Sequence, residues 1–317
     1  MNNKTTVKPK TKQMLSPGHN ACAGCGELIA VRTVAEALGP DTIIANATGC
    51  SEVTTTAYPA SSWGMPWIHS LFENASAVAS GISYALKQKT LPLHKGETKR
   101  GLSEEVKVVA QGGDGATFDI GFGLISGMWE RGDDVLYICY DNESYANTGY
   151  QASGATPWGA NVSTAPAGKG KTLDAIGSHL RKKDMVAIAL AHGLNYVATA
   201  TIGFPDDVTR KIKKAASIKG PSYVQILVPC VPGWKIESNM TIKLGKLATQ
   251  TGLYPSIEYE NGILINAMKI PQSQIKVEEY LKPQGRFSHL FKNELGQEQI
   301  KIIQAMADEN IKKYGLK

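Results

Sequence analysis

Short apolar segments alternate with helical segments along most of this chain, and the alternation limits the folds open to it. Buried strands are predicted at residues 42–47, 106–111, 135–140, 196–202 and 223–228. Helices are predicted around them at residues 28–38, 72–87, 118–130, 185–192 and 205–218. This order is typical of an α/β fold, with a largely parallel sheet covered by helices on both faces. In such sheets ligands bind beyond the carboxyl ends of the strands.

The regular alternation of predicted strands and helices ends after Pro232. A helix is predicted at residues 240–251, a turn or hairpin at Glu260-Asn261-Gly262 and a terminal helix at residues 297–313. The predicted parts of the chain are a basic arm at residues 1–15, a binding domain at residues 16–235 and a C-terminal extension at residues 236–317. We expect the extension to pack on the core or on a partner.

Composition and charge narrow the classes of function. With 42% apolar and 20% charged residues the chain is globular, and none of its apolar runs reaches the roughly 18 residues of a membrane span. The first thirteen residues carry lysines but no apolar segment, so they are not a secretory signal. The net charge of +6 is not concentrated in a long basic block. We expect a cytoplasmic protein that binds neither membranes nor nucleic acid.

The five cysteines are odd in number and far apart, so a disulfide framework is not expected. Cys139 lies inside an apolar strand and is predicted to be a core thiol. Cys22 and Cys25 form a Cys-x-x-Cys pair, whereas Cys50 and Cys230 each follow a predicted strand. Four thiolates suit an iron–sulfur cluster or a structural zinc ion. A redox dithiol and unmetallated thiols are the alternatives.

Two polar turns follow neighbouring predicted strands. The first is Gly112-Gly113-Asp114-Gly115-Ala116, placed between a strand and a helix, where backbone N–H groups can hold a phosphate. The second is the run from Asp141 to Gly149 after the next strand. A carboxylate of Asp114 and an amide oxygen of Asn142 at adjacent strand ends can share one magnesium ion with a diphosphate. A tight turn and a polar loop without a ligand are the alternatives.

This pair of turns resembles the thiamine diphosphate and magnesium motif, and the surrounding sequence resembles the β subunits of the 2-oxoacid:ferredoxin oxidoreductase family. The resemblance runs nearly from end to end, in one order, through residues 18–26, 47–50, 72–75, 113–115, 140–149, 156–157, 166–169, 229–234 and 278–287. It implies the thiamine diphosphate-binding fold with a C-terminal extension.

The resemblance also implies the residues of the site. A [4Fe–4S] cluster would be held by Cys22, Cys25, Cys50 and Cys230. Magnesium would be bound by Asp114, Asn142 and the backbone carbonyl of Ser144. The diphosphate would contact Gly113, Asp114, Gly115, Ala116, Asn142, Glu143, Ser144, Tyr145, Ala146 and Asn147. Glu27 and Cys50 would border the cofactor, and the expected catalytic residues are Asn147 and Glu27.

The implied activity is oxidative decarboxylation of a 2-oxoacid through a thiamine-bound intermediate, with one-electron transfer to the cluster and acyl transfer to coenzyme A. Pyruvate is the expected substrate. The implied partners are an α subunit that completes the active site, ferredoxin-like δ and γ subunits or fused equivalents, and ferredoxin as electron acceptor.

One residue departs from the sequence pattern of the family, and two other classes of protein are alternatives to it. Ala152 replaces an arginine that many members carry, so oxalate and branched-chain 2-oxoacids are the alternative substrates. A non-redox thiamine decarboxylase would not need the four cysteines. A zinc-binding structural or regulatory protein would not need the Asp114 and Asn142 pair.

Overall fold

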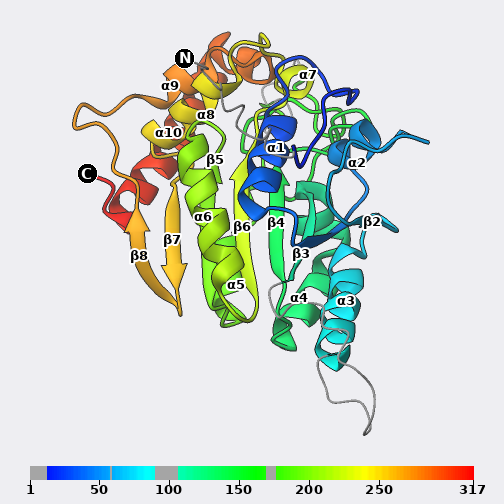
Figure 1. Cartoon of the computed structure of the whole chain (residues 1–317). Coiled ribbons are helices and arrows are strands. Elements are labelled where there is room, and N and C mark those ends of the chain that lie inside the picture. The colour runs from blue at the N-terminus through cyan, green and yellow to red at the C-terminus, as the bar shows by residue number, and fades with distance from the viewer. Residues whose placement is uncertain (1–12, 58, 90–105, 169–175) are drawn as a thin grey trace, which may run out of the picture.

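A computed structural model describes residues 13–57, 59–89, 106–168 and 176–317 (Figure 1). Within these ranges an eight-stranded sheet forms the centre, with the strand order β2-β1-β3-β4-β6-β5-β7-β8. The strands are β1 (Thr42–Asn46), β2 (Trp67–His69), β3 (Lys107–Gly113), β4 (Leu136–Asp141), β5 (Tyr196–Thr201), β6 (Ser222–Leu227), β7 (Ile257–Glu260) and β8 (Ile263–Ala267). Neighbours from β2 to β5 are parallel, whereas β7 and β8 join antiparallel. The predicted α/β fold with a largely parallel sheet is confirmed.

Helices cover both faces of the sheet because successive strand residues point to opposite sides. The helices are α1 (Gly26–Leu38), α2 (Cys50–Thr55), α3 (Ala75–Lys89), α4 (Phe122–Glu130), α5 (Met185–Ala191), α6 (Pro205–Ser217), α7 (Val231–Trp234), α8 (Thr241–Gln250), α9 (Val277–Leu281) and α10 (Glu294–Tyr314). Val109 and Ile138 pack with α1 and α6, which lie side by side in Figure 1. Val108 and Tyr137 face the other way and pack with α3, α4 and α5. None of the described helices combines the length and the apolar character that crossing a membrane requires.

The helix predicted at residues 118–130 is not continuous. A π-helix, η1 (Gly115–Ile120), begins directly after Asp114, and α4 starts only after Gly121. A side chain at Gly121 would come within 2.8 Å of the Glu73 carbonyl oxygen, so only glycine fits at this junction. Because π-helices are frequent at functional sites, the departure from the prediction lies where a ligand site is expected.

Both ends of the described chain pack on the core, which for the C-terminal extension is one of the two expected arrangements. Residues 1–12 of the predicted arm lie outside the described ranges, whereas Met14 and Leu15 are buried in the core. The predicted turn at Asn261 and Gly262 is confirmed, with φ angles of 49° and 78°, and it joins β7 to β8. The extension therefore adds two strands to the main sheet, while α8, α9 and α10 form a further apolar cluster against it. The sequence did not predict the elements β2, α2, α7, α9 and the 3₁₀-helix η3 (Gly285–Phe291).

Candidate functional site

Parallel strand ends bring the two predicted turns together. β3 ends at Gly113 and β4 at Asp141, and Gly113 lies opposite Tyr140 in the ladder between them. Asp114 and Asn142 therefore follow adjacent strands at the same edge of the sheet, as the sequence predicts. The segments before Cys50 and Cys230 end at this edge too, because β1 and β6 flank the same two strands.

Asp114 is a fully buried carboxylate with one unsatisfied oxygen. Its Oδ2 accepts a hydrogen bond from the Ser153 hydroxyl, but Oδ1 has no hydrogen-bond partner among the described residues. Burial, together with the nearby charge of Asp141, raises the pKa of Asp114 well above its ordinary value. A buried carboxylate in this condition is costly unless a cation compensates it. The side chain of Asp114 thus fits a metal ligand.

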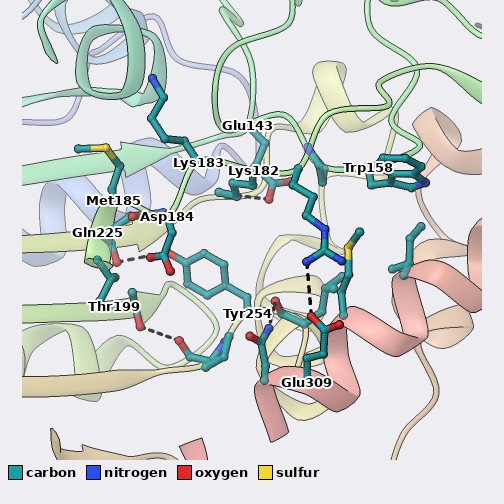
Figure 2. A pocket seen from close by; sticks show the side chains of 18 of the residues that line it. Glu143, Trp158, Lys182, Lys183, Asp184, Met185, Thr199, Gln225, Tyr254 and Glu309 are labelled. Carbon is teal, nitrogen blue, oxygen red and sulfur yellow. Dashed lines mark hydrogen bonds and ion pairs between the residues drawn. The ribbon is translucent and has the colours of Figure 1, made fainter. Parts of the chain in front are cut away.

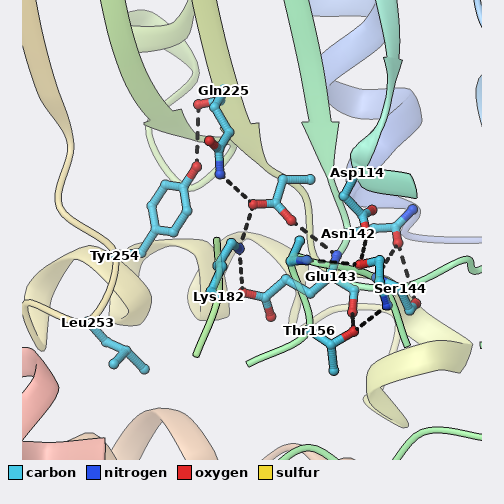
Figure 3. Close-up of polar contacts among 12 residues, drawn as sticks. Asp114, Asn142, Glu143, Ser144, Thr156, Lys182, Gln225, Leu253 and Tyr254 are labelled. Atoms are coloured by element: carbon cyan, nitrogen blue, oxygen red, sulfur yellow. Dashed lines mark hydrogen bonds and ion pairs between the residues drawn. The ribbon is translucent and has the colours of Figure 1, made fainter. Parts of the chain in front are cut away.

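The loop after β4 begins with a tight hydrogen-bonded turn (Figure 3). Oδ1 of Asn142 accepts hydrogen bonds from the Ser144 backbone N–H at 3.2 Å and from the Ser144 hydroxyl at 3.4 Å. The side-chain amide of Asn142 donates to Oε2 of Glu27 at 3.2 Å. Glu27 also accepts a hydrogen bond from the Ser51 backbone N–H at 2.9 Å, so it joins the loop to the segment that carries Cys50. Burial raises the pKa of Glu27 from 4.5 to about 7.

Glu143 has an unusual backbone and a fully occupied side chain. Its φ of 67° lies in the left-handed region, which costs a non-glycine residue roughly 1–3 kcal/mol. Its carboxylate is buried between Lys182 at 2.9 Å and Arg286 at 2.6 Å. Burial would raise the pKa of Glu143, but these two cations outweigh it and lower the pKa. Because the carboxylate is already paired, the predicted contact of Glu143 with a diphosphate would have to involve other atoms.

Lys182 links Glu143 to the end of β4. It lies 2.5 Å from the Asp141 carboxylate, which also accepts a hydrogen bond of 2.7 Å from Gln225. Lys182 and Glu143 line a cavity of about 440 Å³ together with Tyr254 and with Glu309 of α10 (Figure 2). Neither the cysteines nor Asp114 lines this cavity, whereas Glu143 belongs both to its lining and to the predicted cofactor site.

Tyr145 covers the glycine turn. A Cβ atom at Gly115 would lie 2.4 Å from the Tyr145 ring, and the Tyr145 hydroxyl donates to Asp119 in η1 at 3.0 Å. Ala146 is buried, whereas Asn147 is exposed in the following turn. The catalytic role of Asn147 stays a prediction.

The four predicted ligand cysteines interact electrostatically. Burial is the largest cause that raises the pKa values of Cys25 to about 11 and Cys230 to about 12, and it also raises that of Cys50, with contributions from the other thiols. Gly26 donates to the Pro229 carbonyl oxygen, which joins the Cys-x-x-Cys segment to the residue before Cys230. In the described ranges, no three His, Cys, Asp or Glu side chains are already drawn together as metal ligands. Cys139 is buried in β4, as predicted.

Comparison with known proteins identifies the fold of this site. Residues 47–226 match the family described as thiamine pyrophosphate enzyme, C-terminal TPP binding domain. The chain is 48% identical over 309 residues to the pyruvate synthase subunit PorB of Methanosarcina barkeri, covering 98% of this chain and 99% of the relative. The chain belongs to the 2-oxoacid:ferredoxin oxidoreductase family. It carries the thiamine diphosphate-binding fold of a β subunit, and the resemblance seen in the sequence is confirmed.

A further relative and a solved structure are also similar to this chain. The chain is 42% identical to the ketoisovalerate oxidoreductase subunit VorB of Pyrococcus abyssi, covering 88% of this chain and 86% of the relative. A solved 2-oxoglutarate:ferredoxin oxidoreductase from Magnetococcus marinus has a TM-score of 0.55 at 22% identity, covering 77% of this chain and 82% of that one. This last likeness supports the fold. Members of the family named as subunits belong to multi-subunit oxidoreductases.

The sequence did not indicate which residues hold Asn142 and Glu143 in place. Lys182, Arg286 and Trp234 contact Asn142 or Glu143 from distant parts of the chain. The only signal was indirect, because Trp234 and Arg286 lie in stretches that carry the family resemblance.

Proposed function

We propose that this chain is the β subunit of a coenzyme A- and ferredoxin-dependent pyruvate oxidoreductase. The observation that carries the proposal is the buried Oδ1 of Asp114, which has no hydrogen-bond partner among the described residues and lies within the region that matches the thiamine pyrophosphate binding domain. The relatives named pyruvate synthase subunit PorB favour pyruvate, because the first of them matches along almost its entire length.

Different residues at the carboxyl edge of the sheet would bind the metal ion and the diphosphate. Asp114, Asn142 and the Ser144 carbonyl would bind Mg²⁺, whose preferred ligands are oxygens. The Gly113 to Ala116 turn would hold the diphosphate through its backbone N–H groups, with the loop from Asn142 to Asn147 on the other side. When bound, thiamine diphosphate supplies the carbanion-stabilising chemistry that side chains lack.

Glu27 and Asn147 would act around the cofactor. Glu27 holds Asn142 by a hydrogen bond, and its pKa of about 7 lets it keep or release a proton near neutral pH. Asn147 is exposed, so it can donate a hydrogen bond to a substrate oxygen bound at an interface. This exposure also agrees with a site that an α subunit completes.

The cysteines would hold a [4Fe–4S] cluster beside the cofactor. Two hydrogen bonds support this donor set, because Gly26 donates to the Pro229 carbonyl oxygen and Ser51 donates to Glu27, which connects the segments of Cys25, Cys230 and Cys50. Electrons would leave toward ferredoxin-like δ and γ subunits or fused equivalents, and then toward ferredoxin.

The test is anaerobic purification of the chain with its partner subunits, followed by analysis of iron, sulfide, magnesium and thiamine. A panel of pyruvate, 2-oxoisovalerate and oxalate with coenzyme A and a viologen acceptor then identifies the substrate. We expect all four constituents and the fastest reduction with pyruvate. The likeness to VorB makes 2-oxoisovalerate the second candidate. Zinc without thiamine would contradict the proposal.

A further inference from the structure

The short helix α7 joins the segment of Cys230 to the cofactor loop. Cys230 precedes this helix, and Trp234 is its last residue. The indole N–H of Trp234 donates a hydrogen bond of 2.8 Å to the backbone carbonyl oxygen of Asn142. Trp234 is 1% exposed, so water cannot replace this bond. The position of the Asn142 backbone is therefore fixed by a residue four places after a predicted cluster ligand.

Arg286 supports the next residue of the loop. It comes from η3 in the C-terminal extension, is 1% exposed, and reaches the Glu143 carboxylate at 2.6 Å. A second contact fixes its direction, because its Nε donates to Gln284 at 2.9 Å. The guanidinium carbon of Arg286 lies 3.8 Å from the centre of the Trp234 ring. Arginine suits this place because it can stack on an aromatic ring and bind a carboxylate at once.

Trp234 and Arg286 contact two consecutive residues, Asn142 and Glu143, and the backbone of Glu143 is strained. Glu143 has a left-handed φ of 67°, and such a conformation persists only where the surroundings hold it. Trp234 donates a hydrogen bond to the backbone carbonyl oxygen of Asn142, and Arg286 donates one to the side chain of the next residue, Glu143. The backbone at this point determines where Asn142 and Ser144 present their oxygens.

We propose that Arg286 and Trp234 are positioning residues for the metal–diphosphate loop. They fix Glu143 in its left-handed conformation and so place Asn142 and Ser144 for magnesium. They would act through the loop, without contact with cofactor or substrate. The inference rests on the proposed function, because it assumes that this loop binds the cofactor.

The test uses the complete enzyme complex, four single variants and a Glu143→Gln background. Arg286→Gln removes the charge, Arg286→Lys keeps the charge but not the planar group, and Trp234→Phe removes only the N–H donor and part of the ring. Arg181→Gln is the matched control, since Arg181 is an exposed arginine paired with Glu309 at 3.4 Å. Affinity for thiamine diphosphate with Mg²⁺, iron content, kcat, KM and melting temperature are measured for each.

We expect Arg286→Gln and Trp234→Phe to weaken cofactor affinity about 10- to 100-fold, the usual cost of losing a partner that orients a metal ligand. Arg286→Lys should recover part of the loss, and Arg181→Gln should show none. Iron content should stay at the wild-type value. In a Glu143→Gln background, Arg286→Gln should add less than about twofold, because its partner is already gone.

The outcomes separate the two proposals. If the wild-type complex binds no thiamine diphosphate, the proposed function fails. If the wild type binds it and both Arg286→Gln and Trp234→Phe bind it equally well, the positioning role is wrong. Equal losses of cofactor affinity, iron and melting temperature in both variants would also overturn it, because the contacts would then serve only to keep the chain folded.

Discussion

The side-chain amide of Asn142 donates a hydrogen bond of 3.2 Å to the carboxyl group of Glu27, although the two residues lie 115 positions apart. The other oxygen of Glu27 accepts from Ser51, the residue after Cys50. One buried carboxyl group therefore connects the proposed magnesium loop with the cysteine segment. A movement of either segment would therefore change a hydrogen bond of Glu27.

Asp114→Asn should separate metal binding from folding. Asparagine keeps the size of this buried side chain and cannot ionise, and Oδ1 of Asp114 has no hydrogen-bond partner among the described residues, so the metal-free variant should be at least as stable as the wild type. The same change should abolish the stabilisation that Mg²⁺ and thiamine diphosphate give. Thermal unfolding with and without both ligands measures the two effects. Asp133→Asn is the control, because Asp133 pairs with Arg131 away from the site. Unchanged stabilisation of Asp114→Asn by the ligands would contradict the role of Asp114.

The cysteines should divide into two classes by iron content. Serine in place of Cys22, Cys25, Cys50 or Cys230 should remove from the anaerobic complex the iron of the cluster proposed for this chain and leave the iron of the ferredoxin-like subunits, because a [4Fe–4S] cluster needs four thiolates. Cys139→Ala should keep the iron, since Cys139 is buried in β4 among apolar residues. Colorimetric iron and sulfide analysis reads out both classes. Iron loss in Cys139→Ala, with iron retained in any of the other four, would reverse the assignment.

Alanine substitutions of Gly115 and Gly113, in the turn after β3, should affect stability and cofactor binding differently. At Gly115 a Cβ atom would lie 2.4 Å from Tyr145, so Gly115→Ala should lower the free energy of unfolding by about 1–3 kcal/mol. At Gly113 the nearest atom is 3.9 Å away, so Gly113→Ala should leave stability within about 0.5 kcal/mol of wild type. The new methyl group should nevertheless weaken thiamine diphosphate binding, because it fills space proposed for the diphosphate. Denaturant unfolding and ligand titration distinguish the two. Wild-type cofactor affinity in Gly113→Ala would show that the diphosphate lies elsewhere.

The edge of the sheet that carries the site could be predicted from sequence, whereas its internal supports could not. Apolar runs locate β3 and β4, and the polar residues that follow them then meet because parallel strands end together. The left-handed backbone of Glu143 has no such local signal. It depends on Arg286, which is 143 positions away. Contacts at that separation follow from tertiary packing and leave no periodicity in the sequence.

The π-helix η1 also depends on contacts that the local sequence does not indicate. Its residues resemble the start of an ordinary helix, which is why a helix was predicted at residues 118–130. The irregular turn arises where Tyr145 packs over Gly115 and its hydroxyl holds Asp119. Both partners come from a loop that follows the next strand, so local propensity could not reveal them.

His289 should make the stability of the chain depend on pH. It lies in η3 with Arg286, and its Nε2 donates to the Ile176 carbonyl oxygen at 2.8 Å while its buried Nδ1 has no hydrogen-bond partner among the described residues. Burial lowers the pKa of His289 below its ordinary value of 6.5. The folded chain thus favours the neutral ring, and its contribution to stability is complete above pH 6.5 and is lost as the pH falls through the lowered value.

His289→Gln should flatten this pH dependence, because glutamine can donate to Ile176 but does not titrate. Between pH 6.5 and 5, the wild type should lose less than about 1.4 kcal/mol per pH unit relative to the variant. Denaturant unfolding at several pH values measures the difference. His179→Gln is the control, since His179 is exposed. Parallel pH profiles for the wild type and His289→Gln would show that the buried ring is protonated as easily in the folded chain as in the unfolded one.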